Sequence, residues 1–335
     1  MPTLMDTRGP RFAVFQPGRA GDFILTTALF NAIKEAAPAS VLTVIAGPRA
    51  AELAAAHPAI DETLVFDRSP GHMAGLIARL WSRPFDAWID PKTHFSRSSR
   101  RMAILARARS KVGFSEGGGW PFSLSLSSIT PSGSHFVHQA LMPLRLLGLP
   151  EPAKPRVSLG LTPAAEEWAR LQLTGTGEWT TFLNISAGSG SRVWPIACWL
   201  ELLPRLARYR PTTFLLSSAP EDASQAASLA TDARALGVSI RQVPRSGLLS
   251  LAALIRRVNM VLTVDTSIVH IAAAFDRPLV ALYIQEFPAF DRFQPLSSQH
   301  EVVASPRGSP MSAISVERVE QAYVRLAGVL SSFRF

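Results

Sequence analysis

The chain contains a single cysteine, Cys198, among its 335 residues. One cysteine excludes an internal disulfide framework and leaves no thiolate cluster for a structural zinc ion. The chain also lacks an uninterrupted apolar run of the roughly 18 residues that a membrane-spanning helix needs. Asp6, Arg8 and Arg11 precede the first apolar run, which is not the pattern of a secretory signal peptide. These absences lead us to expect a soluble, cytoplasmic protein.

Charged residues are also scarce, at 18% of the chain, whereas 47% of the residues are hydrophobic. This composition favours well-buried cores over disorder, and the length suffices for two domains. Lys and Arg nevertheless outnumber Asp and Glu by 34 to 25, a formal net charge of +9. Because guanidinium groups offer forked, charge-assisted donors, the excess suits a partner with phosphate groups: nucleic acid, anionic lipid or a phosphorylated small molecule.

Short apolar runs alternate with helical patterns in the first half of the chain. The expected strands are residues 12–15, 41–46, 63–66, 87–90 and 112–114. The expected helices are residues 23–37, 74–81 and 97–108. This alternation predicts a parallel sheet with helices on both faces.

A segment with three prolines, residues 149–162, interrupts the pattern and marks the expected domain boundary. The alternation then restarts. Its expected strands are residues 181–186, 213–217, 260–264 and 279–283, and its expected helices are 199–208, 223–236, 248–258 and 269–275. We therefore expect two α/β domains, residues 1–155 and 156–335, facing a central cleft. A last helix over 316–330 is placed to pack back on the first domain.

The loop after the first expected strand reads Gly18-Arg19-Ala20-Gly21-Asp22. Glycines let backbone N–H groups approach a ligand closely, and the N-terminus of the following helix attracts negative charge. Asp22 has two interpretations here. It is either the N-cap of the helix or a carboxylate placed to take a proton from a hydroxyl group.

A second loop, after the strand expected over residues 181–186, is rich in small and hydroxylated residues. It reads Ser186-Ala187-Gly188-Ser189-Gly190-Ser191-Arg192 and leads to a helix that opens near Pro195. Small residues beside a cation suit a phosphate-binding loop. An ordinary flexible turn has the same composition, so both interpretations stay open.

The third loop, after residues 260–264, reads Asp265-Thr266-Ser267-Ile268-Val269-His270. The N–H groups at the start of its helix could hold a diphosphate at the carboxyl end of the sheet. Asp265 could equally be a plain N-cap, and His270 could be a packed core histidine.

These three loops occur in one order at suitable separations. Gly21-Asp22 with its Thr-rich helix, Arg192-x-Trp194-Pro195 and Asp265-Thr266-x-x-x-His270 together resemble glycosyltransferase family 9, the bacterial heptosyltransferases of lipopolysaccharide inner-core synthesis. Residues 87–114 and 135–148 also look like that family's intervening segments. The resemblance implies a GT-B architecture of two Rossmann-like domains, with the acceptor site in the first and the nucleotide-sugar site in the second.

The resemblance further implies an inverting, metal-independent transfer that uses no cofactor. A heptose or related sugar would move from a nucleotide-diphosphate sugar, foremost ADP-heptose, to a lipopolysaccharide-core or other surface-glycan acceptor. Asp22 would be the general base, and Arg192 would neutralise the departing diphosphate. The implied donor-binding residues are Ser186, Gly188, Ser189, Glu221, Asp265, Thr266, Ser267 and His270.

Two positions depart from that family's pattern. Arg192 stands where the family usually has Lys, which keeps the charge but adds a bulkier, forked group. Ser267 stands where the family usually has Gly, and serine adopts a positive φ poorly.

Seven basic residues lie between Lys92 and Lys111. We expect Lys92, Arg97, Arg100 and Arg101 to bind an acidic acceptor, such as a phosphorylated lipid bearing the octulosonic acid Kdo, at the anionic inner face of the cytoplasmic membrane. A solvated helix face is the alternative interpretation of this run. Nucleic acid is not expected as a partner, because no reader motif is present and aromatic residues are not interleaved with the basic ones.

Two other function classes stay open from the sequence. A sugar-nucleotide epimerase, or a relative of glycogen phosphorylase, has a similar two-domain fold, and the epimerase would act without an acceptor. A non-catalytic nucleotide-binding relative would keep the fold and lose turnover.

Overall fold

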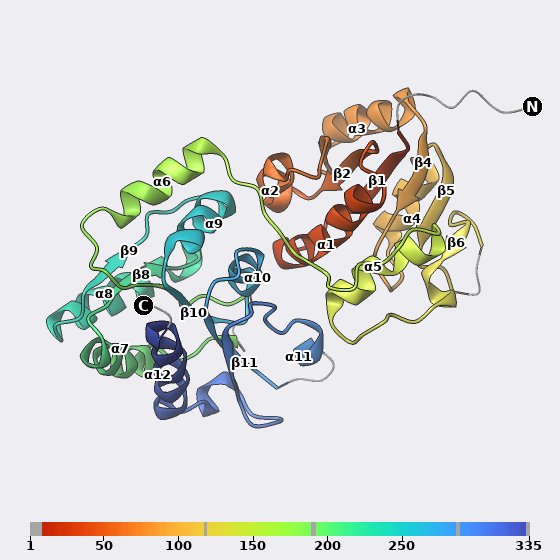
Figure 1. The fold of residues 1–335 in the computed structure, drawn as a ribbon. Coiled ribbons are helices and arrows are strands. Elements are labelled where there is room, and N and C mark those ends of the chain that lie inside the picture. The colour runs from red at the N-terminus through yellow and green to blue at the C-terminus, as the bar shows by residue number, and fades with distance from the viewer. Residues whose placement is uncertain (1–8, 117–118, 189–191, 286–288, 333–335) are drawn as a thin grey trace, which may run out of the picture. The chain divides into compact units, whose positions relative to one another are not determined.

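The computed structural model describes residues 9–116, 119–188, 192–285 and 289–332. It comprises two compact units, Met1–Gly160 and Leu161–Phe335, and each unit is built around its own six-stranded sheet (Figure 1). The boundary expected after residue 155 lies in the segment that joins them. Among the described helices, none is long and apolar enough to cross a lipid bilayer.

The first unit has a fully parallel sheet in the order β3-β2-β1-β4-β5-β6. Its strands are β1 (Arg11–Gln16), β2 (Val41–Ala46), β3 (Glu62–Val65), β4 (Phe85–Ile89), β5 (Ala108–Gly113) and β6 (Leu124–Ser125). Its helices are α1 (Ala20–Ala36), α2 (Ala51–Ala56), α3 (Pro70–Ser82), α4 (Arg97–Leu105) and α5 (Phe136–Leu146). β1 is buried after its first residue, as expected for a central strand covered on both faces.

His57, which follows α2, ties the end of this unit to its core. The ring is 1% exposed. Its Nδ1 accepts the N–H of Ala59 at 3.2 Å, and its Nε2 lies 3.1 Å from the hydroxyl of Ser158. Burial lowers the pKa of His57 to about 4, whereas an unfolded histidine titrates near pH 6.5. The unfolded chain therefore binds more protons between these pH values, and stability is lost as the pH falls below 6.5.

We expect His57 to lower the free energy of unfolding by about 2 kcal/mol between pH 7 and pH 5. His57→Gln removes the titrating ring, so the pH dependence of unfolding by urea should become flatter by that amount. His72→Gln, at an exposed histidine of the same unit, is the matched control and should keep the parent's pH dependence. An unchanged pH dependence in His57→Gln would contradict this account.

The second unit repeats the parallel arrangement, in the order β12-β11-β10-β7-β8-β9. Its strands are β7 (Thr180–Asn184), β8 (Thr213–Ser217), β9 (Ile240–Gln242), β10 (Met260–Val264), β11 (Leu279–Tyr283) and β12 (His300–Ala304). Its helices are α6 (Pro163–Leu173), α7 (Ile196–Tyr209), α8 (Ala223–Ala235), α9 (Leu248–Arg257), α10 (Ser267–Ala274), α11 (Ala289–Arg292) and α12 (Val316–Ser332).

The last helix, α12, packs on α7, β11 and β12 of the second unit. Tyr323 anchors it, because the ring is fully buried and its hydroxyl lies 2.7 Å from Thr181 Oγ1. The same hydroxyl accepts the indole N–H of Trp179 at 3.2 Å. These contacts make α12 part of the second unit's core.

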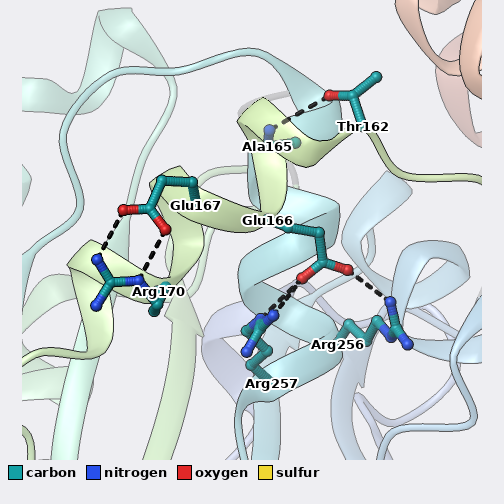
Figure 2. Close-up of polar contacts among 7 residues, drawn as sticks. All are labelled: Thr162, Ala165, Glu166, Glu167, Arg170, Arg256 and Arg257. Atoms are coloured by element: carbon teal, nitrogen blue, oxygen red, sulfur yellow. Dashed lines mark hydrogen bonds and ion pairs between the residues drawn. The ribbon is translucent and has the colours of Figure 1, made fainter.

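The first helix of this unit, α6, is held by polar contacts at its N-terminus (Figure 2). Thr162 is the N-cap, and its hydroxyl accepts the N–H of Ala165 at 3.3 Å. The carboxylate of Glu166 accepts hydrogen bonds of 2.5–2.9 Å from Arg256 and Arg257 in the last turn of α9. An acid in a first turn and cations in a last turn both complement the helix dipoles. The contact therefore fixes α6 against α9.

Both sheets share one topological feature that positions their ligand sites. The strand order reverses between β1 and β4 in the first sheet and between β7 and β10 in the second. In doubly wound sheets, ligands bind beyond the carboxyl ends of the strands at such a reversal. The loops after these four strands are therefore the places to examine for a site.

Candidate active site

In the second unit, the loops after β7 and β10 meet through an ion pair. Nη1 of Arg192 lies 2.9 Å from Oδ2 of Asp265. Both side chains are partly exposed, at 32% and 17%, so the pair borders the surface at the reversal of the sheet. The structure thus brings together two residues that the sequence assigns to the donor site.

Burial raises the pKa of Asp265, and the positive charge of Arg192 opposes that rise. Burial also raises the pKa of the neighbouring Tyr283 hydroxyl well above its ordinary value, with a further contribution from the charge of Asp265. The Tyr283 hydroxyl donates a hydrogen bond to the carbonyl of Phe293 at 2.7 Å. Tyr283 therefore stays neutral beside the ion pair of Arg192 and Asp265.

Asp265 is not the N-cap of α10, which corrects one interpretation left open above. Thr266 is the cap, because its Oγ1 accepts the N–H of Ile268 at 3.3 Å. Ser267 is the first residue of the helix, and among the described non-glycine residues only Asp276 has a positive φ. The concern that serine at 267 would strain the turn is therefore unfounded.

Asn184, at the end of β7, holds the first residues of the loop that follows this strand. It was not singled out from the sequence. Its side-chain amide donates to the carbonyl of Ser186 at 3.0 Å and to Thr263 Oγ1 at 2.9 Å. An asparagine at the end of an apolar strand was the sequence signal that could have identified it. It links the ends of β7 and β10 directly.

The other predicted donor residues that the structure describes lie in the loops and the helix that follow β7, β8 and β10. Ser186 is buried, and its hydroxyl accepts the N–H of Ala219 at 2.7 Å, so it joins the loops after β7 and β8. Gly188 and Glu221 are exposed, and Glu221 lies in the short helical turn Pro220–Asp222 after β8. Ser189 lies outside the described residues. His270 is 4% exposed within α10, with the Phe293 ring 6.3 Å away between centroids.

In the first unit, Asp22 is the third residue of α1 and is half-buried. The N-cap of this helix is Arg19, so the interpretation of Asp22 as the N-cap is wrong. A carboxylate in a first turn is stabilised by the positive end of the helix dipole. A Cβ atom at Gly18 would come within 3.4 Å of Asp22 Oδ2. Glycine at position 18 therefore keeps the space beside this carboxylate open.

A cavity of about 460 Å³ lies at the reversal of the first sheet. Pro17 and Gly18 from the loop after β1 line it, together with Lys92 and His94 from the loop after β4. Asp22 is not one of its lining residues, but Gly18, which lines the cavity, also borders the Asp22 carboxylate. We refer to this cavity below as the first cavity.

The basic run of residues 92–111 separates into two groups in the structure. Three members have partners within the unit: Arg107 donates to the carbonyl of Trp81, Arg109 pairs with Asp86, and Lys111 donates to the carbonyl of Ala103. Arg97, Arg100 and Arg101 are exposed on α4, and among the described residues they form no ion pair. Lys92 is half-buried, and its Nζ lies 3.0 Å from Ser99 Oγ. The four residues expected to bind an acidic acceptor thus lie apart from the three with partners inside the unit, and their role stays a prediction.

No group of three or more His, Cys, Asp or Glu side chains within the described segments is arranged to hold a metal ion. The candidate site thus consists, in each unit, of loops beyond the carboxyl ends of parallel strands. In the first unit, the carboxylate of Asp22 lies beside Gly18, which lines a cavity. In the second unit, Arg192 pairs with Asp265, which lies just before α10.

Two parallel doubly wound sheets of this kind define the GT-B class of glycosyltransferase folds. The model of glycosyltransferase family 9, the heptosyltransferases, matches residues 73–323. The chain therefore belongs to glycosyltransferase family 9, and it is a glycosyltransferase. The resemblance drawn from the three loops is confirmed.

Solved structures share this fold at low sequence identity. A family 9 glycosyltransferase from Veillonella parvula matches with a TM-score of 0.82 and 19% identity, over 96% of this chain and 97% of the other. E. coli heptosyltransferase WaaC with ADP-2-deoxy-2-fluoro heptose gives 0.72 and 20%, over 93% and 98%. E. coli ADP-heptose lipopolysaccharide heptosyltransferase II gives 0.73 and 20%, over 96% and 98%. No curated protein matches the chain in sequence.

Proposed function

We propose that this glycosyltransferase transfers a heptose from ADP-heptose to an acidic sugar of a lipopolysaccharide core or a related surface glycan. The family supports the transferred sugar. Of the E. coli proteins of the same fold, heptosyltransferase II is named for ADP-heptose, and WaaC has a structure with ADP-2-deoxy-2-fluoro heptose. The observation that carries the proposal is the position of Arg192. It stands at the sheet reversal, next to the start of α10, where a diphosphate would find both a cation and helix N–H groups.

On the acceptor side, Asp22 would take the proton from the attacking hydroxyl group. The hydroxyl oxygen then forms a bond to the anomeric carbon as the bond to the diphosphate oxygen breaks, which inverts that centre. A carboxylate within hydrogen-bond reach of the acceptor hydroxyl group can act as this base. The space that Gly18 leaves beside Asp22 would admit the hydroxyl group.

On the donor side, the leaving diphosphate gains negative charge, and positioned donors that meet this charge lower the barrier. Arg192 would supply them. A guanidinium group carries five N–H donors in a planar fork, so contact with Asp265 through Nη1 occupies only part of it. Asp265 would thereby orient Arg192 for the diphosphate.

The charge pattern of α4 supports an acidic acceptor. Arg97 and Arg100 lie in its first turn, which contains no acidic residue. Cations at the positive end of a helix dipole are unfavourable unless an anion lies nearby. An acidic acceptor bound beside α4 would supply that anion.

A panel of nucleotide sugars tests the donor assignment. A ligand that binds only the folded state raises the apparent melting temperature by mass action. ADP-heptose should therefore raise Tm more than GDP- or UDP-sugars at equal concentration. A larger shift with another nucleotide sugar would overturn the choice of ADP-heptose.

We further propose that Arg97, Arg100 and Arg101 hold the protein at anionic lipid surfaces. Each such cation contributes about 1 kcal/mol near an anionic leaflet, and salt screens it within a Debye length of about 8 Å. The protein should sediment with anionic vesicles at low salt and remain in the supernatant at high salt. Reversing these three residues to Glu should abolish sedimentation and reduce transfer to a lipid acceptor.

The matched control reverses three exposed arginines of the second unit, Arg208, Arg245 and Arg318. It changes the net charge by the same amount and should leave sedimentation largely intact. Nucleotide-sugar binding should persist in the α4 variant. Equal sedimentation of the α4 variant and the parent would show that these arginines are only a solvated face.

A further inference from the structure

A second cavity, of about 250 Å³, adjoins the first cavity in the first unit. The two share three lining residues, Lys92, His94 and Ser96. Arg100, Phe114 and Trp120 line the second cavity and not the first. Its volume is below the range of about 300–1,000 Å³ typical of pockets for drug-sized ligands. One sugar ring is an occupant of suitable size, and an entire nucleotide sugar is not.

Aromatic side chains form part of the wall of this second cavity. Trp120 is 67% exposed and Phe95 is 57% exposed, although large aromatic rings are usually buried. The guanidinium of Arg100 lies 5.8 Å from the centre of the Trp120 ring. An exposed, flat aromatic face beside a cavity offers apolar contact, and the C–H face of a sugar ring presents a matching apolar surface.

A buried carboxylate also lines the second cavity. Asp90 is 1% exposed. Its Oδ1 accepts the backbone N–H of Lys92 at 3.1 Å, whereas its Oδ2 has no hydrogen-bond partner in the described parts of the chain. A buried polar atom without a partner is costly. A hydroxyl group reaching the carboxylate from the cavity would supply the missing donor.

The charges around the second cavity balance, and this selects the kind of sugar. Besides the imidazole of His94, two carboxylates, Asp90 and Glu116, and two cations, Lys92 and Arg100, line it. Burial raises the pKa of Asp90, and the charge of Lys92 opposes that rise. Ionisation of this carboxylate is therefore less favourable than that of an exposed one. An anionic ring would add repulsion there, whereas a neutral ring would add a donor without charge.

We propose that the second cavity binds a neutral sugar residue next to the reacting sugar, so that the acceptor is a glycan of at least two residues. This inference rests on the proposed function, with Asp22 as the general base, and it places the reacting sugar in the first cavity, which Gly18 borders on the side of Asp22. The shared residues Lys92, His94 and Ser96 would lie at the junction of the two rings. Trp120 would contact the apolar face of the second ring, and Asp90 would accept a hydrogen bond from one of its hydroxyl groups.

Acceptor length tests this proposal. The acceptors are the methyl glycoside of Kdo alone, the same sugar extended by a neutral hexose, and the same sugar extended by a hexuronic acid. In the parent, the neutral extension should raise kcat/KM about ten-fold over Kdo alone, which is the scale of one aromatic contact. Trp120→Ala should bring this ratio toward 1. Trp81→Ala, at another exposed tryptophan of the same unit, is the matched control and should keep the parent's ratio.

An unchanged ratio in Trp120→Ala, or a preference for the hexuronic acid extension, would overturn the proposal. A donor-free experiment separates it from the proposed function. Saturation-transfer NMR with methyl hexosides should give signals that weaken in Trp120→Ala and persist in Trp81→Ala. Equal signals in the two variants would refute the second cavity as a sugar site, even if no acceptor were glycosylated by the parent.

Discussion

Asp22→Asn is expected to lower kcat by on the order of 10²-fold or more, since an amide cannot take the proton of the acceptor hydroxyl group. The change should leave the free energy of unfolding almost unaltered. Arg19, not Asp22, occupies the N-cap position of α1, so no cap is removed, and the interaction of the Asp22 charge with the helix dipole contributes about 0.5 kcal/mol. Steady-state kinetics with saturating donor, together with urea unfolding, measure both quantities.

Glu35→Gln is the matched control for this experiment. Glu35 is exposed in the last turn of the same helix, so the variant removes one carboxylate from α1 far from Gly18. It should retain turnover. If Asp22→Asn turned over as fast as the parent, the assignment of Asp22 as the general base would have to be abandoned.

Arg192→Ala is expected to lower kcat/KM by about 10²- to 10³-fold, the usual effect of removing one donor that meets developing negative charge. Arg192→Lys should recover part of this loss, because it restores a point charge without the planar fork. Titration with ADP measures the diphosphate contact without turnover. Arg208→Ala, at an exposed arginine of the same unit, should bind ADP like the parent.

The response of Asp265 gives this second prediction an additional readout. In the parent, Arg192 opposes the rise in the pKa of Asp265 that burial causes. Removing the guanidinium should therefore raise the pKa of Asp265 further, and Arg192→Lys should restore part of the parent's value. Equal ADP affinity in the parent and Arg192→Ala would show that the ion pair is structural only.

The sequence predicted the central strands better than the edges of the sheets. β2, β8, β10 and β11 have the expected bounds, because each is an apolar run with strong turn signals on both sides. The edge strand β9 has only three residues, which is too short for a recognisable pattern. The expected helix over 97–108 ends at Leu105, where the chain enters β5. Residue propensities cannot show where a helix ends and a strand begins when the first residues of the strand are polar.

Helix α5 was not predicted as an element, because Pro143 interrupts its pattern. Proline removes one backbone donor and usually ends a helix. Here the helix continues through it, and α5 packs against α1 with most of one face buried. Tertiary packing thus outweighed the local signal.

At the candidate site, the loops could be predicted but not the roles of neighbouring residues within them. Arg19 and Thr266 occupy the N-cap positions for which Asp22 and Asp265 were considered. Backbone geometry selects the cap among adjacent residues, and composition does not report that geometry. Trp120 and the buried Asp90 are distant in sequence, and only the fold brings them to the same cavity. No local motif could therefore have paired them.

The most direct test of the central claim is incubation of the parent protein with ADP-heptose in EDTA, with and without a Kdo-bearing glycan, followed by mass spectrometry. The account predicts an acceptor that gains one heptose and the release of ADP, without added metal. In the absence of the acceptor, the donor should remain or hydrolyse only slowly. An epimerised donor formed without acceptor, or no conversion of the donor under any condition, would contradict the assignment as a heptosyltransferase.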